Sequence, residues 1–198
     1  MPDSSAPESP ARDEAPQKPA GFWAAYRQEI LFIGLFVAIL GGGFTLISWT
    51  PVNDNVIEPF TGLVAKASGW TLNAIGQGIQ MNGTIIRNEK FAVNIKNGCN
   101  GVETLIIFLA AVLAFPAPWK ARLLGLVLGF AAIQGINLVR VVSLFLTGAY
   151  FPEFFDSSHT VVWQSIVILF GVLLWIFWAN RYAAPPTPEV DAAPGNAA

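Results

Sequence analysis

The sequence predicts an all-α integral membrane protein with about four transmembrane helices, and three observations support this prediction. Apolar residues make up 54% of the chain and charged residues only 12%, whereas soluble domains carry about 25% charged residues. The apolar residues gather in four long runs with at most one charge each. A chain of 198 residues is too short to enclose four such helices in a soluble core.

The four apolar runs are the predicted membrane spans, at Ile30–Trp49, Val102–Trp119, Leu123–Leu146 and Val161–Trp178. Each run is about long enough, as a helix, to cross a hydrocarbon core of roughly 30 Å. The first run follows a long polar stretch and lacks a small-residue cleavage site at its end. We therefore interpret it as a membrane anchor and not as a cleaved signal peptide.

The chain divides into a membrane domain at 21–182 and two tails at 1–20 and 183–198. Both tails are rich in proline and poor in large apolar residues. Such segments bury too little apolar surface to offset the entropy of folding, so we expect the tails to be disordered.

The distribution of basic residues predicts the orientation. The link at 148–160 has acidic residues and no lysine or arginine, and the positive-inside rule places such a link outside. Segment 51–101 carries four basic residues, but the charges of a loop of this length have less influence on the orientation. Both termini are then cytoplasmic in the plasma (inner) membrane of a multi-pass protein. The basic residues of the short flanks lie together on the cytoplasmic side: Arg27, Lys120, Arg122 and Arg181.

The outer segment has structure of its own. A short β-hairpin is predicted from Thr84–Arg87 and Phe91–Ile95, whose apolar positions alternate around Asn88-Glu89-Lys90. Before it, apolar residues at broadly helical spacing predict an amphipathic helix on the membrane or on the bundle. These apolar residues are Phe60, Leu63, Val64, Ala67, Trp70, Leu72, Ile75 and Ile79.

Cys99 is the single cysteine of the chain, so no intrachain disulfide and no metal site with four thiolate ligands is possible. It lies between two glycines, just before the second apolar run. Asn100 is a predicted helix N-cap and Glu103 completes a capping box. The helix dipole would favour the thiolate of Cys99, which the Glu103 charge partly offsets. The alternative is that Cys99 is an inert packing residue.

Arg140 is a charged residue inside the third run. At 1.5 Å per residue it lies about 26 Å from Leu123, and therefore close to the outer surface. It shares a side of the helix with Gln134, Asn137 and Ser143, which predicts that this side lines the bundle interior. The alternative is an arginine that extends to the membrane interface.

His159 is the single histidine and is predicted to open the fourth span, with Ser157 or Ser158 as its cap. The helix dipole there disfavours the imidazolium, which keeps a neutral base available. The alternative is an ordinary interfacial histidine. One histidine and one cysteine exclude HExxH-type zinc chemistry, and we expect no metal and no cofactor.

The predicted topology brings Cys99, Arg140 and His159 to the same face of the membrane. A thiol within reach of an imidazole is an activated nucleophile that attacks an amide carbonyl. A guanidinium can stabilise the resulting oxyanion or hold a substrate carbonyl. This combination favours a cysteine peptidase or transpeptidase. The residues that we assign, as candidates, to substrate binding or support of the site are Asn97, Asn100, Glu103 and Asn137.

Three short motifs resemble the exosortase/archaeosortase family. They are Asn-Gly-Cys99-Asn-Gly, Asn137-Leu-Val-Arg140-Val and His159-Thr-Val-Val-Trp, and the resemblance covers about residues 55–180. The short chain looks like the compact exosortase H type. Two features depart from the family pattern: Asn100 stands where many members have serine, and only one clear span precedes Cys99.

The resemblance implies that Cys99 is the nucleophile, that Arg140 stabilises the intermediate or orients the substrate, and that His159 is the base or acid. It also implies the substrates, which are exported proteins with a C-terminal sorting signal. Such a signal consists of a short motif, a transmembrane helix and a basic cluster. Cleavage near the motif, with transfer to a surface acceptor, is the reaction that the family resemblance suggests.

Two other functions remain open at this point. One is a non-catalytic membrane scaffold, assembly factor or transporter subunit, in which Arg140 pairs with Glu103. The other is a thiol redox protein, which the lack of a second cysteine disfavours. The net charge of −2 provides no basic surplus for nucleic acid, so membrane lipid and exported proteins are the predicted partners.

Overall fold

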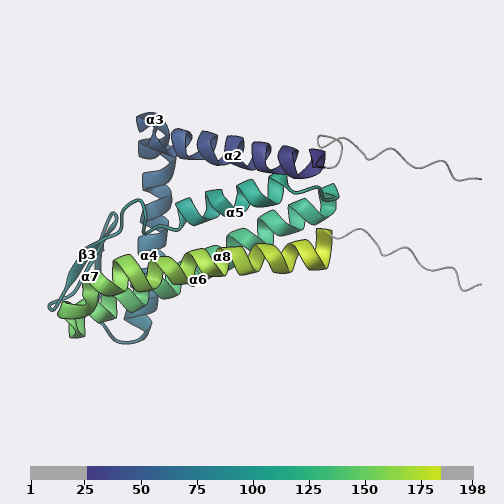
Figure 1. The fold of residues 1–198 in the computed structure, drawn as a ribbon. Coiled ribbons are helices and arrows are strands. Elements are labelled where there is room, and N and C mark those ends of the chain that lie inside the picture. The colour runs from purple at the N-terminus through teal and green to yellow at the C-terminus, as the bar shows by residue number, and fades with distance from the viewer. Residues whose placement is uncertain (1–25, 184–198) are drawn as a thin grey trace, which may run out of the picture.

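The computed structural model describes residues 26–183, so tail 1–20, and tail 183–198 beyond Ala183, lie outside it. Apolar helices dominate the fold and a small sheet joins two of them, which confirms the predicted fold class (Figure 1). The main helices are α2 (Arg27–Ser48), α4 (Glu58–Ala74), α5 (Val102–Ala114), α6 (Trp119–Tyr150) and α8 (Gln164–Trp178). Short helical segments lie at α3 (Thr50–Val52), η1 (Asn53–Ile57), η2 (Pro152–Phe154), α7 (Phe155–Ser157), η3 (Ser158–Trp163) and η4 (Ala179–Ala183).

Three helical stretches of the described chain are long and apolar enough to cross a membrane: α2, α6 and the continuous stretch Pro152–Ala183. The second apolar run forms a shorter helix than predicted. This helix, α5, has 13 residues and is about 20 Å long. The reason is Pro116, which disfavours helical geometry at the preceding residue. Phe115 is extended, with φ −70° and ψ 135°, and ends the helix.

The long helices alternate in direction along the chain. Figure 1 shows the start of α2, the connection between α5 and α6, and the end of η4 at one end of the bundle. The other end carries α3, the sheet and α7. Consecutive long helices of the bundle therefore run antiparallel to one another (Figure 1).

Helix α4 lies across the bundle, nearly at right angles to its helices (Figure 1). Its buried face consists mainly of small residues, and part of the predicted apolar face is exposed on the protein. Leu63 and Trp70 are 62% and 67% exposed, while Val64 and Leu72 are buried. The helix ends at Ala74, before the last two predicted positions. The buried residues are Thr61, Val64, Ala65, Ser68, Gly69 and Leu72.

The predicted hairpin is confirmed by β2 (Ile85–Arg87) and β3 (Ala92–Asn94), which pair antiparallel with Ile86 opposite Val93. A further strand, β1 (Gln80–Asn82), pairs with β2 to make a three-stranded sheet. The sequence analysis missed β1 because two of its three residues are polar and give no apolar alternation. The sheet leads the chain from α4 into the Cys99 loop.

The core beneath the sheet joins it to α4 and α6. Its buried members include Leu72, Ile86 and Phe145. The ring of Phe91 packs edge-on against Phe145, with 5.6 Å between their centroids. It also occupies the space in which a Cβ at Gly148 would lie. These contacts fix the sheet, and with it the start of the Cys99 loop, on the C-terminal half of α6.

Candidate functional site

The loop before α5 presents Cys99 in a tight turn. Cys99 donates its backbone N–H to the carbonyl of Lys96 at 2.9 Å. Gly98 and Gly101 have φ values of +87° and +79°, a left-handed conformation that glycine adopts without steric cost. The two glycines therefore allow the chain to reverse direction on either side of Cys99.

The start of α5 differs by one residue from the predicted capping box. Gly101, not Asn100, is the residue that precedes the helix. Asn100 still accepts the N–H of Val102 through its side-chain oxygen, at 3.1 Å. Glu103 accepts the N–H of Gly98 at 2.7 Å, so its carboxylate supports the loop and not the residue next to the helix. The left-handed turn at Gly101 separates Asn100 from the helix, so the Glu103 carboxylate bonds to the N–H of Gly98 and not to that of Asn100, which the capping box predicted.

Two asparagines attach the Cys99 loop to the α4 side of the molecule. Asn100 is fully buried and donates to the hydroxyl of Thr61 at 2.8 Å. Asn97 donates to the side chain of Asn53 at 2.8 Å. Both asparagines were candidates in the sequence, whereas Asn53 and Thr61 were missed. Asn53 and Thr61 were missed because no sequence pattern connects a polar residue to a hydrogen-bond partner about forty positions away.

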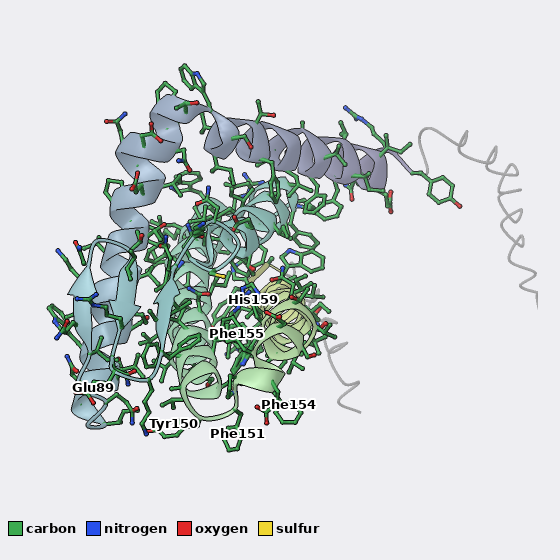
Figure 2. The ribbon with its side chains drawn as sticks, turned by 90° about the vertical axis from the view of Figure 1, so that its left-hand side faces the viewer. Glu89, Tyr150, Phe151, Phe154, Phe155 and His159 are labelled. Carbon is green, nitrogen blue, oxygen red and sulfur yellow. The ribbon has the colours of Figure 1, made fainter. Side chains whose placement is uncertain are left out.

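His159 lies against the cysteine. The Sγ atom of Cys99 and the Nε2 atom of His159 are 2.8 Å apart. The imidazole stacks on the ring of Phe155, with 5.9 Å between centroids and 8° between planes, and Figure 2 labels both residues on the α7–η3 segment. A residue one helical turn before His159 thus fixes the plane of its ring. Phe155 was not predicted, since nothing in the sequence separates it from its aromatic neighbours.

The helical context of His159 corrects the sequence analysis. The helical stretch begins at Pro152 and continues to Ala183, so His159 does not open it. Neither Ser157 nor Ser158 forms a side-chain cap there, and His159 lies within the π-helical segment η3. The dipole argument for a neutral imidazole is therefore wrong, because it applies only to the first turn of a helix.

Arg140 is buried inside the bundle. Its side chain is 2% exposed, and its Nη2 donates to the Oε1 atom of Gln164 at 3.2 Å. This burial contradicts an arginine that extends to the interface. Helix α6 also continues beyond Arg140 to Tyr150, so the guanidinium is not at the end of its helix. The predicted length of the third span was too short because the apolar run ends before the helix does.

Arg140 belongs to a buried polar strip on α6. Asn137, one turn earlier, is fully buried, and neither of its amide atoms has a hydrogen-bond partner among the described residues. The Nε atom of Arg140 is likewise buried without a partner there. A Cβ on Gly101 would meet the Cγ atom of Asn137 at 3.1 Å, so the strip faces the end of the Cys99 loop. An unpaired buried polar atom costs about 1–3 kcal/mol, so these atoms favour any hydrogen-bond partner that reaches them from outside the described residues.

The structural alternative required an ion pair between Arg140 and Glu103. In residues 26–183, the hydrogen bond of Arg140 goes to Gln164 and that of Glu103 goes to Gly98. The pair is therefore not formed. Glu103 instead supports the Cys99 loop, and Arg140 connects α6 to α8.

The electrostatic environment of the thiol differs from the sequence expectation. Burial raises the pKa of Cys99 above its ordinary value, the charge of Arg140 lowers it, and the charge of Glu103 raises it. Burial has the largest effect, so the thiol is the favoured form, whereas the dipole argument favoured the thiolate. The turn at Gly101 separates Cys99 from the first residue of α5, so the thiol is not in line with the helix dipole. The effect of desolvation on the thiol pKa is therefore the larger one. Thiolate formation then requires a base, and His159 is in contact.

We predict that Glu103→Gln lowers the pKa of Cys99. The glutamine oxygen can still accept the N–H of Gly98, while the charge that raises the thiol pKa is removed. More thiolate is then present at each pH below the titration midpoint, and alkylation by iodoacetamide becomes faster there. The measurement is the alkylation rate of the single cysteine as a function of pH, with Glu89→Gln, at the far end of the sheet (Figure 2), as the matched control. An unchanged profile in Glu103→Gln would show that this charge does not act on the thiol.

Fold and site together define a helical membrane protein with a half-buried Cys–His pair and a buried guanidinium in one bundle. A comparison with protein families matches residues 22–179 to the transmembrane exosortases. The chain belongs to this family, as the three sequence motifs indicate. Searches of curated proteins and of solved structures return no significant match.

Proposed function

We propose that the protein is a membrane-embedded cysteine endopeptidase or transpeptidase that processes the C-terminal sorting signals of exported proteins. The observation that carries this proposal is the 2.8 Å contact between the Cys99 thiol and the His159 imidazole. Membership of the transmembrane exosortases supports the same chemistry. Cys99 acts as the nucleophile, His159 as the base and then the acid, and Arg140 as the oxyanion or substrate ligand.

The first half-reaction follows from the contact. His159 Nε2 takes the proton of the Cys99 thiol, and the thiolate attacks the carbonyl carbon of the scissile peptide bond. The carbonyl oxygen becomes an oxyanion, which the buried guanidinium of Arg140 stabilises. When the intermediate collapses, the carbon–nitrogen bond breaks and the imidazolium returns its proton to the leaving amine. The product is a thioester on Cys99.

The second half-reaction releases the thioester. Water or an acceptor amine attacks the thioester carbonyl after His159 removes its proton, and the sulfur leaves as the thiolate, which is then reprotonated. Water gives hydrolysis, and an amine gives transfer of the exported protein to the acceptor. Both outcomes use the same three residues.

The remaining candidates have supporting roles in this proposal. Asn97, Asn100 and Glu103 hold the loop that presents Cys99, through Asn53, Thr61 and the N–H of Gly98. Asn137 has free amide atoms beside this loop and is the residue of the four best suited to bind the substrate backbone. A cavity of about 470 Å³ lies next to the loop and is lined in part by Lys96 and Asn97, but not by Cys99, Arg140 or His159, so it can hold only a part of the substrate away from the scissile bond.

The proposed location is the plasma (inner) membrane, with both termini cytoplasmic and the Cys99 loop on the extracytoplasmic face. The basic flanks at one end of the bundle support this orientation. A substrate that has been exported, and whose own helix remains in the bilayer, would then meet Cys99 on the side to which it was delivered.

The test is co-expression with a tagged exported protein that ends in a short motif, a transmembrane helix and a basic cluster. The proposal predicts a shorter product and a covalent adduct at Cys99 that hydroxylamine releases, as expected for a thioester. A substrate without the motif is the matched control. Persistence of the intact precursor, with no adduct at Cys99, would contradict the proposal.

A further inference from the structure

Gln164 connects the guanidinium of Arg140 to the helical stretch that carries His159. Its Oε1 atom accepts a hydrogen bond from Arg140 Nη2 at 3.2 Å. Arg140 comes from α6 and is 2% exposed, whereas Gln164 is the first residue of α8 and is half-buried. The stretch Pro152–Ala183 therefore supplies both the imidazole that contacts Cys99 and the acceptor that contacts Arg140.

The π-helical segment η3 explains how one stretch supplies both groups. His159 and Gln164 are five residues apart, and in an α-helix such residues point about 140° away from each other. A π turn closes its hydrogen bonds between residues five apart, so that these residues lie on the same side. η3 spans Ser158–Trp163, and Gln164 follows it directly. Such π segments inside α-helices occur frequently at functional sites.

The chemistry of the acceptor is informative. A carboxylate in this place would form a buried ion pair and cancel the positive charge of Arg140 within the site. The neutral amide of Gln164 fixes one N–H of the guanidinium and leaves the full charge in place. That charge acts on Cys99, because Arg140 lowers the pKa of the thiol. The Nε–H of Arg140 is still without a partner among the residues that the structure describes.

We propose that Gln164 is the positioning residue for Arg140: the π-helical segment aligns it with His159, and its amide holds the guanidinium beside Cys99 without neutralising it. The catalytic consequence rests on the proposed function, but the physical claim concerns only the guanidinium and the thiol. Gln164 acts through Arg140, and the hydrogen-bond contact of the Cys99 sulfur within residues 26–183 is with His159.

The main test uses the thiol itself and needs no substrate. His159 from η3 contacts the Cys99 sulfur, and the charged groups that shift the pKa of Cys99 are Arg140 from α6 and Glu103 from α5. The full-length protein in detergent has one cysteine, so the pH dependence of its alkylation by iodoacetamide reports on this thiol alone. The variants are Gln164→Met, Arg140→Met and the double variant, with Ser165→Ala as an exposed neighbouring control.

In this double-mutant cycle, we expect the effects of the Gln164 and Arg140 substitutions on the alkylation profile to be coupled, that is, not additive in the double variant. Gln164→Met shifts the alkylation profile to higher pH, in the same direction as Arg140→Met and by less. In the Arg140→Met background the glutamine substitution has no further effect, because its action passes through the arginine. An unchanged profile in Gln164→Met, or an equal extra shift in the double variant, would overturn the proposal.

A second variant covers the case in which Gln164→Met does not accumulate in the membrane. Gln164→Glu keeps an oxygen acceptor for Arg140 and adds a negative charge near the thiol. It should shift the alkylation profile to higher pH, and this shift should shrink when Arg140 is replaced, because the carboxylate then loses the partner that holds it in place. A shift of the same size with and without Arg140 would contradict the proposed contact.

With a processed substrate, the same variants give a second readout. Gln164→Met is expected to lower kcat by about 10- to 100-fold with little change in KM, as misplacement of a transition-state group does. If the wild-type protein processes no substrate, the proposed function fails while the thiol titration still decides the role of Gln164. If the substrate is processed and the cycle shows no coupling, only the role of Gln164 fails.

Discussion

Replacement of Cys99 by alanine is expected to abolish processing of the exported substrate, and intact precursor should accumulate in the membrane. The chain contains no other thiol that could replace the nucleophile, and it has no second imidazole that could activate a hydroxyl elsewhere. Loss of a nucleophile in such a site costs several orders of magnitude in rate, as it does in serine proteases. The measurement is the ratio of precursor to product in cells that express equal amounts of wild-type and variant protein.

The controls for this variant separate chemistry from folding. Cys99 is half-buried in a loop that backbone and asparagine contacts hold, so the alanine variant should accumulate normally. Cys99→Ser is expected to be far less active than the wild type, because a hydroxyl has a much higher pKa than a thiol and the hydrogen bond of His159 is optimised for sulfur, not for the shorter serine side chain. Normal processing with Cys99→Ala would eliminate the enzymatic proposal, whichever residues surround the site.

Much of the fold could be predicted because membrane helices have a strong sequence signal. The apolar runs located α2 and α6, and alternation located the hairpin of β2 and β3. Helix ends were predicted less well. Pro116 shortens α5, and the helix that carries His159 begins at Pro152, before its apolar run. Hydropathy does not report these ends. A proline can end a helix inside an apolar run, and polar residues can continue a helix beyond such a run.

The candidate site was predictable in its rare residues and not in its common ones. One cysteine, one histidine and one arginine inside a span are few enough to be noticed, and the structure brings Cys99 and His159 into contact. Gln164, Thr61 and Asn53 belong to abundant residue types, and their roles depend on partners distant in sequence. Their contribution follows from the π segment and the loop geometry, neither of which has a clear sequence signal.

Replacement of Arg140 by methionine is expected to lower kcat by about 10²- to 10³-fold, which is the usual cost of losing a donor to the oxyanion. Methionine fills a similar volume, so the substitution removes the charge and leaves the packing of α6 against α8 largely intact. Arg140→Lys keeps a charge but lacks the planar fork that reaches Gln164 and the substrate at once, so it should restore only part of the activity. The measurement is the single-turnover rate of substrate cleavage.

The stability of the same variant makes this prediction diagnostic. Arg140 is 2% exposed and hydrogen-bonds to a neutral side chain, so its burial carries a desolvation cost that no ion pair offsets. Arg140→Met should therefore melt at the same temperature as the wild type or higher, while it loses activity. A structural arginine would show the reverse, a lower melting temperature with processing retained in the folded fraction. Arg122→Met, at the opposite end of α6 where the guanidinium donates to the carbonyl of Phe115, is the matched control and should leave the cleavage rate unchanged. A buried charge that destabilises the bundle and yet accelerates the reaction is what a site organised around an oxyanion requires.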